Sequence, residues 1–403
     1  MGRFFNRERF GHAQIAAGFL LLLFVAECAW LTAHEHPTSL DATDLNRFAV
    51  EEGYEQWHGR GIAGTPTIGN ESQTLGNNFD PEHSALWYLT AAVPVAPFHL
   101  SSEHRSYVWL TRAPYVAFGA LLGASLWYVS RRLYGNAGGF VALGLYCFSP
   151  TVIRASTLWS APPQTGAAWG LFGAVFTAIA VSHTLYAPRE VVLWNWRRIL
   201  LLAVSLALAI GSEFQLAVVV PVLLAFMLYL APSRKSAAGV ILGAACAIAL
   251  GLLFASYFFH PSLLWHGLLE ATWLHVSGRA LAMRGAYLQV GKEVVASGPV
   301  MALLVPASLL AYASWRRSRY FGNTAPLIVV LLFVFLRAGS PHPSDSIHSL
   351  IAVIFLFVFV AGISADLLES RFRNPVLAVL PGILGANALW NLLGLWDIGP
   401  WRR

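Results

Sequence analysis

Side chains suited to acid–base or phosphate chemistry stand in this sequence beside long apolar runs. Asp41 and Asp44 come shortly after the first of these runs. A carboxylate in that place could take a proton from a hydroxyl group. Asp44, which precedes residues 45–52, also suits the N-cap of a helix, and both residues could belong to a solvated acidic loop. The two aspartates are therefore candidates for chemistry, with these structural roles as the alternative.

Glu82 and His83 are neighbours just before a short apolar stretch. A carboxylate beside an imidazole could bind a divalent metal or hold a phosphate group, although a metal needs at least one further ligand that the sequence does not identify. The alternative is a pair at the membrane interface that is hydrogen-bonded to nearby backbone. Other histidines could also ligate a metal, although thirteen histidines make chance grouping easy: His34 and His36, and His342 with Asp345 and His348.

Three arginines, Arg112, Arg154 and Arg337, lie near the ends of apolar runs. An arginine in such a place is a candidate for function, and a lipid phosphate is a natural partner for its guanidinium group. The competing explanation is that these side chains reach toward lipid head groups. Glu213 lies between two apolar runs and needs water or a partner, so it is expected either near substrate or paired with one of these arginines.

Eleven apolar segments must position these residues. About 20 apolar residues span the hydrocarbon core as a helix, and the chain is 57% hydrophobic but only 11% charged. We expect spans at about 12–33, 108–130, 136–154, 163–186, 198–212, 214–231, 237–259, 297–315, 324–338, 347–365 and 375–395. The first is expected to be an uncleaved helix, with a signal peptide as the alternative. The pair 198–212 and 214–231 is expected to form a hairpin, with one long tilted helix as the alternative.

Basic residues cluster at every second boundary between these segments, as expected where Lys and Arg are retained on the cytoplasmic side. The clusters are Arg3/Arg7/Arg9, Arg131/Arg132, Arg189/Arg197/Arg198, Arg234/Lys235, Arg316/Arg317/Arg319 and Arg371/Arg373. The pattern predicts a cytoplasmic N-terminus and a C-terminus outside. The net charge of +6 is therefore no signal for nucleic acid, because the basic residues border apolar runs.

The predicted fold is an all-α polytopic membrane protein in which residues 1–403 form a single membrane-embedded domain. The first outer loop, 34–107, is long and acidic. Within it, residues 84–98 are apolar but interrupted by Pro94 and Pro97, which predicts short interfacial or re-entrant helices. Residues 260–296 form the second outer segment, and 339–346 a short third.

Five short stretches follow one another in the first 235 residues. Residues 40–44 read LDATD, 80–83 DPEH, 110–114 LTRAP, 131–135 RRLYG and 148–150 FSP. Their order and spacing resemble the GT-C superfamily of polyprenyl-phosphate-sugar-dependent glycosyltransferases, which includes protein O-mannosyltransferases and bacterial aminoarabinose transferases. A weaker topological agreement continues to about residue 370.

This resemblance implies transfer of a hexose or pentose from a polyprenyl-phosphate donor to a glycan, lipid or protein acceptor. The reaction would take place at the outer face of the inner (plasma) membrane. It implies Asp44 as the first candidate for the catalytic base and Asp41 as the second. It also implies cationic or metal stabilisation of the leaving phosphate. A divalent metal ion is a candidate cofactor without identified ligands. The candidates for binding the substrate or its lipid phosphate are Glu82, His83, Arg112, Arg154, Glu213 and Arg337.

The sequence also departs from the family pattern. Leu45 stands where a second acidic residue is usual, Pro162 where a carboxylate is usual, and Glu213 where a lysine is usual. These differences favour an alternative, a catalytically degenerate protein that binds lipid or serves as an accessory subunit. A transporter is less favoured, because no pair of broken helices in two symmetric halves is visible.

Overall fold

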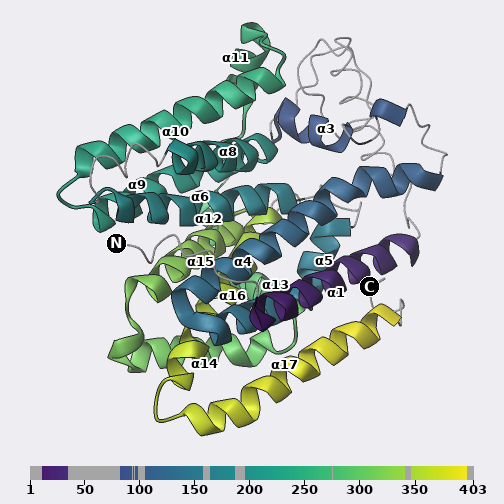
Figure 1. The fold of residues 1–403 in the computed structure, drawn as a ribbon. Coiled ribbons are helices and arrows are strands. Elements are labelled where there is room, and N and C mark those ends of the chain that lie inside the picture. The colour runs from purple at the N-terminus through teal and green to yellow at the C-terminus, as the bar shows by residue number, and fades with distance from the viewer. Residues whose placement is uncertain are drawn as a thin grey trace.

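Helices make up all the regular structure in the part of the chain that the structure, a computed structural model, describes (Figure 1). That part comprises residues 11–34, 82–92, 94, 96–98, 105–157, 164–186, 196–274, 276–340 and 346–396. The α-helices are α1 (His12–His34), α3 (Ala85–Ala92), α4 (Arg105–Cys147), α5 (Pro150–Thr157), α6 (Thr165–Thr184), α8 (Trp196–Ser212), α9 (Val219–Leu230), α10 (Lys235–Ser256), α11 (Pro261–Glu270), α12 (Gly278–Leu281), α13 (Arg284–Ala296), α14 (Met301–Ser314), α15 (Phe321–Gly339), α16 (Ser346–Leu368) and α17 (Arg373–Trp396). Short 3₁₀ helices are η1 (Ala96–Phe98), η2 (Phe214–Val218) and η3 (Arg316–Ser318).

Within these residues, seven helices are long and apolar enough to cross a membrane, namely α1, α4, α6, α10, α15, α16 and α17. The count becomes eight if α13 and α14, which meet at a bend of 112°, form one broken span. Every one of the eleven predicted spans nevertheless falls on helical structure. Eleven predicted spans become eight because α4 contains two of them and because α8 and α9 have only 17 and 12 residues. They become seven when α14, which has 14 residues, is not joined to α13.

The helix α4 doubles back on itself at Gly135. This residue has φ 74° and ψ −175°, a conformation that essentially only glycine adopts. The Tyr146 hydroxyl donates a hydrogen bond of 2.5 Å to the carbonyl of Gly119, although 27 residues separate them. The two parts of α4 are therefore antiparallel, which confirms the turn predicted between residues 130 and 136. The third predicted span, 136–154, is broken before α5, because Pro150 has no N–H to continue the helix.

The segment 198–231, predicted as a hairpin, is a hairpin in the structure. Arg198, near the start of α8, donates a hydrogen bond to the carbonyl of Ala180 on α6. After α9, Ser233 contacts the Tyr186 hydroxyl with its own hydroxyl at 3.2 Å. Both contacts lie at the C-terminal end of α6. The start of α8 and the end of α9 are therefore at the same end of the bundle. The alternative of one long helix is thereby excluded.

Five of the basic clusters gather at one end of the bundle, which we call the basic end and which faces left in Figure 1. The Tyr134 hydroxyl, beside Arg131/Arg132, donates to the carbonyl of Gly322 at 2.6 Å. Phe321 stacks on Tyr229 with ring centroids 5.4 Å apart, which brings the α9–α10 turn and its Arg234/Lys235 to the same place. Tyr320 donates to Asp366, close to Arg371/Arg373, and the Ser233 contact adds Arg197/Arg198. Arg3, Arg7, Arg9 and Arg189 lie outside the described residues.

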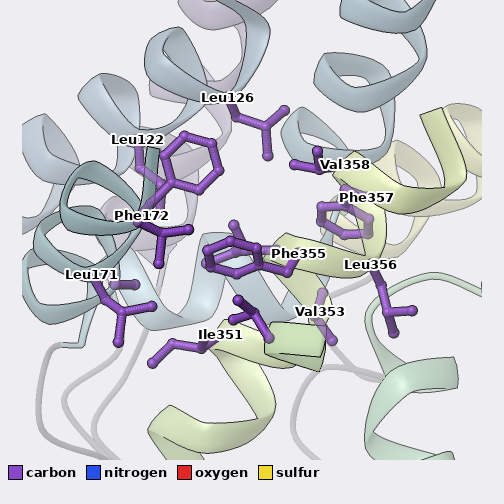
Figure 2. Packing of buried hydrophobic residues seen from close by; sticks show 14 of the residues in the cluster. Leu122, Leu126, Leu171, Phe172, Ile351, Val353, Phe355, Leu356, Phe357 and Val358 are labelled. Carbon is purple, nitrogen blue, oxygen red and sulfur yellow. The ribbon is translucent and has the colours of Figure 1, made fainter. Parts of the chain in front are cut away.

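The core is built around α16, which lies in the middle of the bundle between the outer helices α10 and α17 (Figure 1). Every residue from Ile347 to Ala365 is buried. Figure 2 shows Phe355 reaching between neighbouring helices toward Phe172, and their ring centroids are 5.5 Å apart. The helices α6 and α8 approach so closely that a Cβ on Gly170 would lie 2.6 Å from the Ala209 nitrogen. A helix buried on all sides and a ring of apolar helices with lipid-type outer faces make this an all-α polytopic membrane protein.

Candidate functional site

The predicted site residues that the structure describes lie toward the end of the bundle away from the basic clusters. We call this the distal end, and it holds the C-terminal ends of α1, α8, α10 and α15. Asp41 and Asp44 lie outside the described residues, as does most of the predicted first outer loop. Its described part includes two short helices, α3 (Ala85–Ala92) and η1 (Ala96–Phe98), in the stretch 84–98 for which the sequence predicts short helices; their place at the membrane interface stays a prediction.

The segment Glu82–Ser84 is docked onto the tip of the α8–α9 hairpin. The Phe214 N–H donates to the carbonyl of Glu82 at 2.9 Å, and the Ser84 N–H donates to the carbonyl of Gly211 at 3.0 Å. The Ser84 hydroxyl donates to the same Gly211 carbonyl at 2.6 Å. These bonds satisfy backbone groups at the end of α8 that have no partner within the helix. The polar stretch before α3 is thus fixed relative to Glu213.

His83 and Glu213 face each other at this junction. The His83 Nε2 lies 3.8 Å from Glu213 Oε2, and both side chains are almost fully buried. The imidazole stacks on Trp87, with ring centroids 4.6 Å apart. Glu213 itself has an extended backbone (φ −160°, ψ 106°), so it interrupts the helices at the hairpin tip. The arrangement holds an acid and an ionisable ring side by side without free access of water, where electrostatic interactions are strong.

Arg337 belongs to a second polar cluster, formed by α13, α15 and α16. Its guanidinium group forms a bidentate pair with Glu293 at 2.7 and 3.0 Å. It also donates to the carbonyl of Ser340 at 2.9 Å, and the Ser349 hydroxyl donates to Glu293. Burial favours the neutral form of Glu293, but the hydrogen bonds from Arg337 and Ser349 outweigh it, and the pKa of Glu293 is lowered.

The other two arginines stand on separate helices. Arg112 is buried near the start of α4, and Arg154 is half-buried on α5. Both elements reach the distal end. The structure therefore brings Glu82, His83 and Glu213 together, while Arg337 joins Glu293.

The predicted metal sites fall mostly on residues that the structure does not describe, including His36, His342 and Asp345. The His34 Nδ1 donates a hydrogen bond of 2.9 Å to the carbonyl of Trp30, and the imidazole stacks on the Trp30 ring. His348 is buried on α16. Within the described residues no group of three His, Cys, Asp or Glu side chains is arranged to hold a metal ion.

Sequence reasoning missed three residues of these clusters, namely Glu293, Ser349 and Trp87. Glu293 and Ser349 each lie on a different helix from Arg337, and nothing in their local sequence marks the pairing. Trp87 follows His83 by four residues, a spacing that places two side chains on one helical face. That signal was available for Trp87 alone.

Among solved structures, the chain is similar to the archaeal oligosaccharyltransferase AglB from Archaeoglobus fulgidus, solved in complex with an inhibitory peptide and a dolichol-phosphate. The TM-score is 0.58 at 12% sequence identity, and the likeness covers 94% of this chain and 54% of that chain. This chain thus spans about half the length of the solved protein. No protein-family model matches the chain, and no curated protein matches it. At such low identity the likeness shows a shared fold, and it confirms the fold class that the sequence predicts.

Proposed function

Because the chain has the GT-C fold, we propose that it is a membrane glycosyltransferase that uses a polyprenyl-phosphate-linked sugar at the outer face of the inner (plasma) membrane. The observation that carries this proposal is the docking of Glu82–Ser84 onto the hairpin tip, with His83 against Glu213, at the end of the bundle opposite the basic turns. The complex of AglB with a dolichol-phosphate supports a lipid-linked substrate.

In the proposed reaction the bond between the sugar's anomeric carbon and the donor phosphate oxygen breaks. A new bond forms between that carbon and the acceptor hydroxyl oxygen, and the acceptor proton passes to a carboxylate. Asp44 is the first candidate for this base and Asp41 the second. The polyprenyl phosphate leaves with the bonding electrons, so positive groups near it lower the barrier. A protonated His83 held by Glu213 would supply such a charge, with Arg112, Arg154 and Arg337 as further candidates. The acceptor is a glycan, lipid or protein.

A second candidate function is a lipid-binding or accessory protein without turnover. The observation that favours it is the bidentate pair of Arg337 with Glu293, which already occupies the guanidinium face that would hold a phosphate. In that case the distal end binds the lipid-linked sugar but transfers nothing.

The test is a transfer assay with the full chain reconstituted in liposomes, supplied with labelled polyprenyl-phosphate hexoses and pentoses. We expect labelled product from the wild type and a loss of 100-fold or more in Asp44→Asn and in Glu213→Gln. Asp366→Asn, which alters a carboxylate at the basic end, serves as the matched control and should retain activity. Binding of the labelled donor without product in the wild type would reject the enzyme and favour the second function.

A further inference from the structure

Glu27 is an acidic residue within the first membrane span. It lies on α1, seven residues before the end of that helix, and its side chain is only 4% exposed. An ionisable group inside a span is costly to keep there, and it marks a functional site by default. This residue plays no part in the proposed sugar transfer.

The helix α17 carries two buried amides, and one of them meets α1. Asn387 and Asn391 are one turn apart, so they share a face of the helix, and they are 4% and 2% exposed. The Asn391 Nδ2 donates a long hydrogen bond of 3.4 Å to Glu27 Oε2. Asn387 packs against the bend between α13 and α14, where a Cβ on Gly298 would lie 2.8 Å from its Oδ1.

This group has more hydrogen-bond acceptors than donors to satisfy them. Glu27 Oε1, Asn387 Oδ1 and Asn391 Oδ1 are buried acceptors without a hydrogen-bond partner. Within the described residues, no lysine or arginine forms an ion pair with Glu27; the pairs found there join His83 with Glu213 and Arg337 with Glu293. Buried polar atoms normally have partners, and an uncompensated buried charge is strongly destabilising. The group therefore lacks a positive species rather than another acceptor.

We propose that Glu27, Asn387 and Asn391 form a binding site for a small monovalent cation of the sodium type between α1 and α17. Oxygen atoms of carboxylates and amides are the ligands that hard cations take. A single charge balances the single carboxylate. In the proposed site the cation would take all three unpartnered oxygens as ligands, whereas a proton on Glu27 could be shared by only two of them.

Occupancy of this site fixes α17 to the rest of the bundle. Only 17% of the residues in the apolar stretch of α17 are buried, against 89% in α16. The helix thus has little apolar packing to hold it; its Asn391 meets α1 at Glu27, and its Asn387 meets the bend at Gly298. The cation would join the two helices through ligands from both.

The test measures thermal unfolding of the purified full-length protein in detergent while sodium chloride replaces choline chloride at constant ionic strength. We expect the midpoint temperature to rise with sodium, as for any ligand that binds only the folded state. Glu27→Gln should remove this dependence. Asp366→Asn is the matched control, since it removes a half-buried carboxylate at the basic end, and it should respond to sodium as the wild type does.

A wild type whose midpoint is independent of sodium would overturn the proposal, as would an unchanged sodium response in Glu27→Gln. A midpoint that follows pH but not sodium would show that Glu27 carries only a proton, which also overturns it. Should Glu27→Gln fail to fold, binding of radioactive sodium to the wild type and to Asn387→Ala decides the question. These measurements need no sugar transfer, so they stand or fall separately from the proposed enzyme.

Discussion

The two ends of the bundle use charged residues in different ways. At the basic end, arginines such as Arg131, Arg132 and Arg317 sit in short turns with exposed or half-exposed side chains. At the distal end, ionisable side chains are buried or half-buried against one another, as in His83 with Glu213 and Arg337 with Glu293. Exposed charges gain little from pairing, whereas buried charges must be paired. We infer that charge at the basic end sets orientation, and that charge at the distal end holds structure and would serve the proposed sugar transfer.

The largest expected effect comes from breaking the distal ion pair. Arg337→Ala leaves Glu293 partly buried without its cation, so the free energy of unfolding should fall by about 3 kcal/mol. Denaturant titration in detergent micelles measures it. Arg132→Ala at the basic end is the control. Equal losses in both variants would contradict the difference between the ends.

At the basic end, we expect the backbone conformation of Gly135 to matter more for stability than the charged side chains do. Gly135→Ala forces a side chain into a conformation with φ 74°, which should cost about 2 kcal/mol. Nothing lies within 4 Å of the added Cβ, so the cost is one of backbone strain alone. Gly144→Ala, which has similar open space in the same helix, should be neutral or slightly stabilising by the same titration. A neutral Gly135→Ala would mean that the turn is not held as described.

Glu293 at the distal end should make the stability of the protein depend on pH in acid. Because the pKa of Glu293 is lower in the folded protein than in the unfolded chain, its ionised form contributes stability above the ordinary glutamate pKa. That contribution is lost as the pH falls below about 4, toward the lowered pKa. The midpoint temperature of thermal unfolding should therefore drop in acid. Glu293→Gln should have a lower midpoint at neutral pH, and its midpoint should fall less steeply as the pH is lowered. If the midpoint of Glu293→Gln falls as steeply in acid as that of the wild type, the role of Glu293 is contradicted.

The smallest effect is expected from single basic turns. Arg131→Ala removes a side chain that bonds Asn136 at the surface, and its loss should change the free energy of unfolding by less than about 0.5 kcal/mol. Denaturant titration checks this value. A fall of more than about 1 kcal/mol in the free energy of unfolding would show that arginines of the basic end also stabilise the fold.

Much of the bundle could be predicted from the sequence, because span length and basic turns are local properties. The turn at Gly135 and the hairpin around Glu213 are examples, since each lies between two apolar runs. Pairings between distant segments could not be predicted in this way. Ser84 meets Gly211 across 127 residues, and the partner of Arg337 depends on how three helices meet. Glu27 did carry a local signal, a carboxylate inside an apolar run, which sequence reasoning overlooked.

The most direct test of the central claim asks on which side of the membrane each end lies. Ser236 and Ser262 are exposed; Ser236 lies in the first turn of α10, and Ser262 lies at the start of α11, just beyond the other end of α10. Single cysteines at these positions, in a background with Cys28, Cys147 and Cys246 replaced, can be labelled on intact cells with a membrane-impermeant thiol reagent. We expect rapid labelling at Ser262→Cys and none at Ser236→Cys until the cells are lysed. Labelling at Ser236→Cys with protection at Ser262→Cys would place the distal end in the cytosol and contradict the proposed outer-face transferase.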